Sequence, residues 1–382
     1  MNRYLFDQPN RSKCKQETKE ASVREGEEEE SFATGITKIG HLMGTDNVLE
    51  LKGKEDKSQW KVLIEDISVL QWVFSFLFLG TACLLLMIYL MFTSLWLFPT
   101  LYFTWQIYDW HTPERGGRRT KFVRSWEVWK HYRDYFPVKL VKTAELSPSK
   151  NYIMGCHPHG IMCVGAFSCF STDRNGFAET FPGIRPTLAI LAGLFRLPLV
   201  REYILSAGLL PVSKESLDYL LSRTGVGNAV VIIIGGAEES LTSSPGVNTL
   251  VMKHRKGFVR LALEHGADLV PVYSFGENEL FPQVVLSEGS VGRRLQVLFK
   301  QIMGFAPCLF TGGRWLLLPY RRPVTTVGQF KTLAFHIIFS LTMIIAFVKN
   351  QDVAGRDPFH LYATDTNRTA ELFFRLKYHF LV

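Results

Sequence analysis

The 382-residue sequence lacks the patterns that mark several large enzyme classes. It contains no G-x-S-x-G turn, which argues against an α/β-hydrolase serine, and no phosphate-binding P-loop. Gly225-Val226-Gly227 lacks the third glycine of a dinucleotide fingerprint and precedes a strand rather than a helix. A zinc finger, an RNP motif and a basic helix are also missing, so we expect no nucleic-acid partner.

Cysteine is sparse and follows no disulfide-framework spacing. None of the six cysteines pairs as C-x-x-C; they are Cys14, Cys83, Cys156, Cys163, Cys169 and Cys308. This usage predicts reduced thiols in a cytosol-facing protein.

Charged residues and histidine are absent from all 42 residues between Ile67 and Tyr108. One passage through the hydrocarbon core needs about 20 apolar residues. The stretch therefore predicts two passes with a turn near Thr93, Ser94 or Pro99, and we assign 61–110 to a membrane hairpin. Lysines precede the stretch and arginines follow it, so both ends are expected in the cytosol. A long buried core helix is the alternative.

The net charge of +8 is unevenly spread. Residues 1–66 carry a net −3, which leaves +11 for the rest of the chain. A basic body predicts an anionic partner such as lipid headgroups or a phosphate-bearing substrate. Residues 1–60 have no apolar signal-peptide core and are expected to form a flexible polar arm.

Two further segments have a distinctive composition. Residues 111–150 are basic and aromatic, and we expect them to form a collar on the membrane interface, or alternatively a helix packed on the core. The aromatic residues in and next to this region include Trp110, Trp126, Trp129, Tyr132, Tyr135 and Phe136. Within 329–382, Thr332 to Val348 is apolar apart from one histidine, and its length suits a membrane-associated segment.

From residue 151 to 328 the sequence reads as an α/β domain. Apolar runs at 152–156, 209–212, 229–234 and 269–275 predict strands, and 214–222 and 256–265 predict helices. This alternation predicts a mostly parallel sheet flanked by helices, with the active site at the carboxyl ends of the strands.

The first candidate site follows the strand at 152–156. His157-Pro158-His159-Gly160 places two imidazoles at a strand end, because Pro fixes φ and Gly permits a sharp turn. An imidazole there suits a general base. A purely structural cap and a metal site are the alternatives, the latter with few ligands nearby.

The second candidate site follows the strand at 229–234. Gly235-Gly236-Ala237 leads into Glu238 and Glu239, which are expected at the same sheet edge as His159, where a carboxylate can orient an imidazole. The alternative is an ordinary acidic helix N-terminus. Basic residues near strand ends are candidates for phosphate binding or for solvated surface charge: Arg185, Arg196, Arg201, Arg255, Lys256 and Arg260. Cys156 stays open as a nucleophile.

These blocks, in this order, resemble the type 2 acyl-CoA:diacylglycerol acyltransferase family, which includes monoacylglycerol and wax-alcohol acyltransferases. The resemblance runs from about residue 66 to about residue 327 and rests on His157-Pro158-His159-Gly160, Phe181-Pro182-Gly183-Ile184-Arg185-Pro186, Arg255-Lys256-Gly257-Phe258, the segment 269–278 and the segment 109–119. Phe76-Leu77-Phe78-Leu79 is similar to the neutral-lipid-binding motif of that family.

The resemblance implies a glycerolipid-acyltransferase-like enzyme of the endoplasmic reticulum membrane and lipid droplets. It would move an acyl chain from acyl-CoA, a co-substrate, to diacylglycerol without a covalent intermediate, a metal or another cofactor. His159 would be the general base, with His157 and Glu239 beside it, and backbone N–H groups near the turn would bind the oxyanion. The implied substrate-binding residues are Pro158, Gly160, Arg185, Arg196, Arg255, Lys256, Phe76, Leu77 and Leu79.

The chain departs from the family pattern after Phe310 and again after Gly328. The family carries a longer block before Pro319, and it continues past Gly328 with a proline-containing strand. Three alternatives therefore stay open: a monoacylglycerol acyltransferase, a catalytically impaired lipid-binding variant, and a hydrolase that uses Cys156 or water. A homo-oligomer also stays open.

Overall fold

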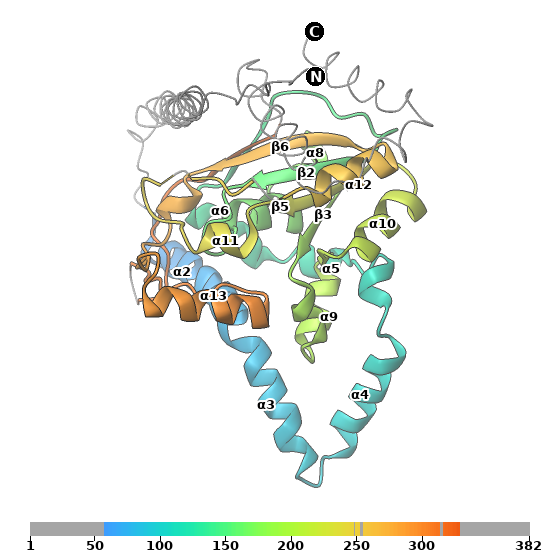
Figure 1. Cartoon of the computed structure of the whole chain (residues 1–382), viewed down its shortest axis with the longest axis vertical. Coiled ribbons are helices and arrows are strands. Elements are labelled where there is room, and N and C mark those ends of the chain that lie inside the picture. Colours follow the sequence, from blue (N-terminus) through green and yellow to red (C-terminus); the bar gives the residue numbers. More distant parts are fainter. Residues whose placement is uncertain (1–56, 248, 253–254, 314–315, 329–382) are drawn as a thin grey trace, which may run out of the picture. The chain divides into compact units, whose positions relative to one another are not determined.

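The computed structural model describes residues 57–328, except 248, 253–254 and 314–315. A seven-stranded sheet with the order β1-β7-β6-β2-β5-β3-β4 forms its centre (Figure 1). The strands are β1 (Lys139–Lys142), β2 (Tyr152–His157), β3 (Arg185–Ile190), β4 (Leu210–Pro211), β5 (Asn228–Ile233), β6 (Asp268–Phe275) and β7 (Thr325–Gly328).

Five neighbouring strands, β6 to β4 in the sheet order, run parallel to one another. β7 pairs antiparallel with β6 and parallel with β1, so these two strands run the opposite way. The predicted α/β class is confirmed, and the sheet is mixed at one side. The four predicted strands correspond to β2, β4, β5 and β6.

The helices cover the sheet and supply the connections between parallel strands (Figure 1). The predicted helices at 214–222 and 256–265 correspond to α10 and α12. The helical elements after residue 110 are η2 (Thr112–Arg115), α5 (Lys121–Arg124), α6 (Glu127–Tyr135), α7 (Val164–Ala166), η3 (Phe167–Ser171), α8 (Phe177–Thr180), η4 (Ala192–Arg196), α9 (Val200–Ser206), α10 (Lys214–Arg223), α11 (Gly236–Ser240), α12 (Gly257–His265), η5 (Glu277–Glu279) and α13 (Val291–Met303).

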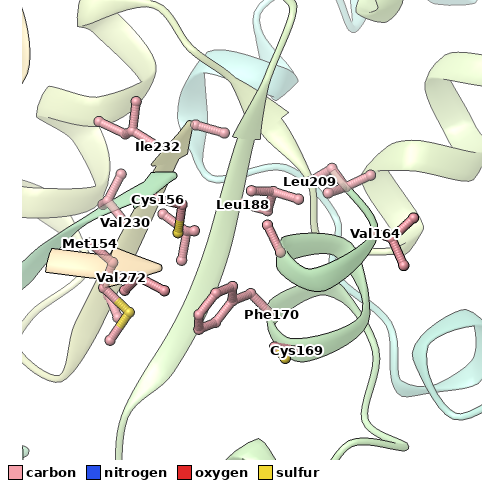
Figure 2. Close-up of a cluster of buried hydrophobic side chains, with 14 of the residues drawn as sticks. Met154, Cys156, Val164, Cys169, Phe170, Leu188, Leu209, Val230, Ile232 and Val272 are labelled. Atoms are coloured by element: carbon pink, nitrogen blue, oxygen red, sulfur yellow. The ribbon is translucent and has the colours of Figure 1, made fainter. Parts of the chain in front are cut away.

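The core lies along the central strands. Every residue of β2 is buried, as are the first five residues of β5, because a strand covered on both faces has no solvent side for polar residues. Met154 of β2 and Val272 of β6 line one small cavity together with Phe170 of η3, and Figure 2 shows these side chains in the core. This packing holds the carboxyl ends of β2, β5 and β6 in fixed relative positions.

The amino-terminal helices form a long apolar element and a shorter one. α2 (Gln59–Phe74), η1 (Ser75–Leu79) and α3 (Gly80–Met91) join into one 33-residue helix, which by length and composition is a candidate membrane span. The chain turns at Phe92–Trp96, as predicted near Thr93, and α4 (Leu97–Tyr108) follows. α3 and α4 extend away from the sheet (Figure 1) and expose most of their large apolar side chains.

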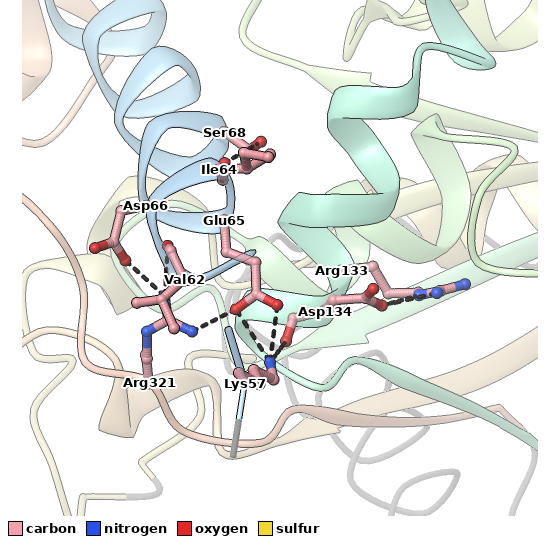
Figure 3. Close-up of polar contacts among 9 residues, drawn as sticks. All are labelled: Lys57, Val62, Ile64, Glu65, Asp66, Ser68, Arg133, Asp134 and Arg321. Carbon is pink, nitrogen blue, oxygen red and sulfur yellow. Dashed lines mark hydrogen bonds and ion pairs between the residues drawn. The ribbon is translucent and has the colours of Figure 1, made fainter. Parts of the chain in front are cut away.

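The first half of α2 belongs to the folded body. Glu65 is fully buried and accepts hydrogen bonds from Lys57 (2.9 Å) and Arg321 (2.5 Å), while Asp66 accepts one from Arg321 at 2.6 Å. Figure 3 shows how these charges fasten α2 to the segment that precedes β7. The predicted membrane segment 61–110 therefore includes a part of α2 that belongs to the folded body through these ion pairs and through the buried Val69, Trp72 and Val73.

The aromatic residues at 129–136 lie in the core rather than on the surface. The aromatic side chains of Trp129, Tyr132, Tyr135 and Phe136 are buried, and Tyr132 packs edge-on against Trp72 of α2 with 5.1 Å between ring centroids. The alternative of a helix packed on the core thus describes this part of the 111–150 segment. The predictions for residues 1–56 and 329–382 lie outside the described residues.

Candidate active site

Three neighbouring parallel strands bring titratable groups together at their carboxyl ends. β2 ends at His157, β5 leads through Gly235 into α11 with Glu239, and β6 leads through Gly276 into Glu277. Because the sheet order is β6-β2-β5, the histidine turn lies between the two glutamates. The structure thus brings His157, His159 and Glu239 to one edge, where sequence reasoning expected them.

Glu239 is almost completely buried, and its carboxylate is saturated with donors. His157 Nδ1 lies 3.0 Å from Oε2, the backbone N–H of His159 lies 2.6 Å from Oε1, and the backbone N–H of Val251 lies 2.9 Å from Oε2. Burial alone would raise the pKa of Glu239. The hydrogen bonds from His157 and the two N–H groups outweigh it, so the pKa is below its usual value.

This geometry differs from the expected pairing of Glu239 with the His159 ring. Glu239 contacts the ring of His157 and only the backbone of His159. The side chains at 157 and 159 are two residues apart in sequence, and sequence alone does not fix which ring turns inward. The N–H of His159 donates to Glu239, so this one N–H group is not available to bind the oxyanion.

The His159 side chain is partly exposed, whereas His157 is 1% exposed. His159 Nδ1 lies 3.2 Å from the carbonyl oxygen of Gly160 and 3.4 Å from Sγ of Cys163. Burial of the ring lowers the pKa of His159 below its ordinary value, although the Gly160 carbonyl and Glu239 oppose this shift. A neutral imidazole is therefore favoured near pH 7.

Glu277 is the site residue that sequence reasoning missed. It is 3% exposed, and its two carboxylate oxygens accept the backbone N–H groups of Val164 (2.7 Å) and Gly165 (2.8 Å). Burial raises its pKa to about 7 against the effect of these bonds. Its position directly after a buried strand is the same signal that marked Glu239.

Gly160 is required where the turn meets Glu277. Its φ is +59°, and a Cβ there would lie 2.7 Å from Cγ of Glu277. Pro158 precedes it in the turn and is buried, and the His157–Pro158 peptide bond is cis. Glu277 thus fixes the loop after the histidine turn from one side, and Glu239 fixes the turn itself from the other.

The thiols near the histidines are poor nucleophiles. Burial raises the pKa of Cys156 and of Cys163 well above the usual range, and neighbouring charged groups add to the shift at Cys163. A hydrolase that uses Cys156 is therefore disfavoured. All five cysteines within the described residues are free.

The basic residues predicted to bind phosphate lie in different parts of the fold. Arg255 donates to the Gly235 carbonyl at 3.0 Å, and Lys256 caps α12, so both lie at the active-site edge. Arg196 follows β3 and lies 3.7 Å above the Trp110 ring, next to the base of α4. Arg201 is buried against Asp109.

Arg185 lies at the opposite edge of the sheet. It starts β3, its register partner is Asn228 at the start of β5, and its guanidinium donates to the Thr224 carbonyl at 2.8 Å. Arg185 therefore lies a full strand length from the histidine turn, because the amino and carboxyl ends of a strand are on opposite edges of a parallel sheet. Its role in substrate binding stays a prediction.

The predicted neutral-lipid motif lies in η1, between α2 and α3. Phe76 and Phe78 are about half exposed, while Leu77 and Leu79 pack against the core. Metal-ligating side chains gather elsewhere: within the described residues, Asp218, Glu264 and His265 form the one group of three or more. This group does not include His157 or His159.

Comparison with known proteins decides the family. A sequence profile described as "Diacylglycerol acyltransferase" matches residues 88–330, which is more than half of the chain. The chain belongs to the diacylglycerol acyltransferase family. Its match to the family therefore includes the histidine turn, both glutamates and the edge that they share.

Relatives in this family are similar over most of their length. Diacylglycerol O-acyltransferase 2 of Xenopus laevis is 57% identical over 270 residues, which cover 69% of this chain and 75% of the relative. The human protein of the same name is 52% identical over 302 residues, covering 78% and 77%. Human 2-acylglycerol O-acyltransferase 3 is 53% identical over 277 residues, covering 71% and 81%. No solved structure matches the chain.

Proposed function

We propose that this chain transfers an acyl group from acyl-CoA to the free hydroxyl of diacylglycerol and so makes triacylglycerol. Membership of the diacylglycerol acyltransferase family supports acyl transfer. The observation that carries the mechanism is the arrangement of His159, whose Nδ1 is occupied by the Gly160 carbonyl and whose side chain is partly exposed.

His159 is the proposed general base. A neutral imidazole that donates Nδ1–H to a carbonyl keeps its lone pair on Nε2. This nitrogen takes the proton from the acceptor hydroxyl while the hydroxyl oxygen attacks the thioester carbonyl. The new C–O bond forms, the C–S bond breaks, and the departing CoA thiolate takes the proton from His159. No covalent enzyme intermediate is needed, because a thiolate is a good leaving group.

Glu239 and His157 act in this proposal as positioning residues. Neither reaches the reacting atoms: His157 is buried, and Glu239 is bound to its ring and to the N–H of His159. The carboxylate therefore fixes the backbone from which the His159 ring projects. Holding the base in the productive geometry lowers the entropic part of the activation barrier.

Arg255 and Lys256 are the proposed ligands of the CoA phosphates. They lie at the active-site edge, beside the N-terminus of α12, where cationic side chains and helix N–H groups both favour anions. The proposed reaction needs no metal and no cofactor besides the co-substrate acyl-CoA.

The proposed membrane anchor is a shallow hairpin made of α3 and α4, with both ends in the cytosol. Each helix has 12 residues and so measures about 18 Å, less than the roughly 30 Å of a hydrocarbon core. Their exposed apolar side chains suit lipid, and the base of α4 meets the loop after β3 through the Gln106–Arg196 hydrogen bond of 3.1 Å. We propose the endoplasmic reticulum membrane and lipid droplets as the location.

The acceptor is tested in microsomes from cells that lack their own triacylglycerol synthesis. Labelled oleoyl-CoA is supplied with diacylglycerol or with monoacylglycerol, and the labelled glycerides are separated. Labelled triacylglycerol from diacylglycerol supports the proposal. Product from monoacylglycerol alone would favour the second candidate, a monoacylglycerol acyltransferase, which the 53% identity to 2-acylglycerol O-acyltransferase 3 motivates.

The same assay addresses the remaining alternatives. Labelled free fatty acid without any glyceride would indicate a hydrolase. No product from either acceptor, with the protein present in the membrane, would contradict the proposed transferase and favour a lipid-binding variant.

A further inference from the structure

α13 (Val291–Met303) exposes an apolar ridge along its whole length. Val291, Leu295, Leu298 and Ile302 are 73%, 60%, 51% and 72% exposed. Their spacing of four, three and four residues places them on one face of the helix. An amphipathic helix of a globular protein normally turns this face toward the core, so four exposed large side chains in a row indicate a surface that contacts something else.

The opposite face of α13 attaches the helix to the protein. Gln296 is buried and donates to the Pro307 carbonyl at 3.0 Å, and a Cβ at Gly292 would meet Leu286 at 2.9 Å. The helix is therefore held by its polar side and presents its apolar side outward. This orientation is the reverse of ordinary core packing.

The charge of α13 indicates which partner suits the ridge. The helix contains Arg293, Arg294 and Lys300 and no Asp or Glu. Arg294 is exposed and flanks the ridge, whereas Arg293 and Lys300 lie on the far side of the helix. An apolar face on a helix of net charge +3 fits a bilayer surface that contains anionic phospholipids. A purely apolar protein partner would gain nothing from this positive charge.

The position of α13 is continuous with the helices that form the proposed hairpin. A Cβ on Gly304, at the end of α13, would lie 3.2 Å from Leu191, and Leu197 presses against Gly80 at the start of α3. The Arg196 carbonyl between them accepts the side chain of Gln106 from α4. One short segment, 191–197, therefore touches all three helices, and Figure 1 shows α13 crosswise to α3.

We propose that α13 lies flat in the headgroup region of an anionic membrane, with the ridge of Val291, Leu295, Leu298 and Ile302 in the acyl chains. This contact goes beyond the proposed catalysis and does not depend on it. The loops that flank α13 also reach α11: Gln283 donates to the Ser240 carbonyl at 2.7 Å, next to Glu239. The membrane contact thus adjoins the active-site edge.

The test places an environment-sensitive fluorescent amino acid at position 298 of the full chain, reconstituted in vesicles of phosphatidylcholine and phosphatidylserine. Nitroxide-labelled lipid and aqueous iodide are the two quenchers. The matched control carries the same amino acid in place of Glu215, an exposed residue of α10. We expect lipid quenching and a loss of iodide quenching at position 298, and the reverse at position 215.

Two results would overturn the proposal. Equal iodide quenching at the two positions would mean that the ridge faces water. Protection from both quenchers would mean that protein covers it, for instance a second copy or residues 329–382. Vesicles of phosphatidylcholine alone test the charge argument. Lipid quenching at position 298 should fall in them, and unchanged quenching would refute the role of the positive charge of α13.

Discussion

Replacing Glu239 with Gln tests whether this carboxylate positions the catalytic turn. The substitution keeps the shape of the side chain and removes one acceptor. In the native site, Oε1 receives the N–H of His159 at 2.6 Å and Oε2 receives the N–H of Val251 at 2.9 Å, while His157 Nδ1 lies near both oxygens. An amide offers one oxygen and one NH₂ group, so one of the two backbone N–H groups must face a donor.

The expected loss of activity follows from the backbone N–H group that Glu239→Gln leaves without an acceptor. A buried donor left without an acceptor costs about 1–3 kcal/mol. If the cost falls on the geometry of His159 in the transition state, kcat falls about 10- to 100-fold, since about 1.4 kcal/mol corresponds to tenfold. The negative charge of Glu239 also raises the pKa of His159. Its loss lowers that pKa, so the acid limb of the pH–rate profile should move to lower pH.

The assay is the rate of triacylglycerol formation in proteoliposomes between pH 5 and pH 8. The control is Glu215→Gln, which removes an exposed carboxylate from α10, and the conservative Glu239→Asp tests for partial rescue. Wild-type kcat with an unmoved acid limb in Glu239→Gln would refute the positioning role. A loss of kcat with an unmoved acid limb would show that the charge of Glu239 does not influence the pKa of His159.

Two further predictions concern the side of the histidine turn that faces Glu277. Gly160→Ala should reduce activity at least about tenfold and lower the melting temperature, because residue 160 has a left-handed backbone conformation and the new Cβ would meet Glu277. The control is Gly193→Ala, whose new Cβ would meet nothing within 4 Å and which should behave like wild type. Glu277→Gln should change the pH dependence of stability. Since the pKa of Glu277 is raised to about 7 in the folded state, the folded chain holds its proton more tightly than the unfolded chain. The difference in melting temperature, wild type minus Glu277→Gln, should therefore fall as the pH rises from about 4.5 to about 7 and stay level above that.

Each of these two predictions has a clear contrary result. A Gly160→Ala variant with the activity and melting temperature of Gly193→Ala would mean that the turn is not confined by Glu277. A melting-temperature difference between wild type and Glu277→Gln that is constant across this pH range would mean that Glu277 titrates in the folded state as in the unfolded one.

The sequence predicted β2, β4, β5 and β6, but it did not predict β1, β3 or β7. β2, β5 and β6 are buried on both faces, so their sequences are continuously apolar and bounded by turn residues. β1 and β7 have four residues each and carry little signal of their own. Their order in the sheet depends on the antiparallel pairing of β7 with β6, a tertiary contact.

The site was predictable to the level of the sheet edge. Strand ends identified the histidine turn and Glu239, because parallel strands place their carboxyl ends together. Which imidazole binds Glu239 depends on side-chain rotation within the folded core, which local pattern does not encode. The sequence does not tell at which end of a strand a neighbouring basic residue lies, and Arg185 lies at the start of β3, away from the histidine turn.

We propose His159 as the base for acyl transfer to diacylglycerol. The most direct measurement is the rate of triacylglycerol formation by His159→Ala, at matched amounts of membrane-bound protein. The control is His265→Ala, which removes an imidazole that pairs with Asp218 outside the site. We expect a loss of about 100-fold or more for His159→Ala, the range for a missing general base, and little change for His265→Ala. Wild-type activity in His159→Ala would contradict it.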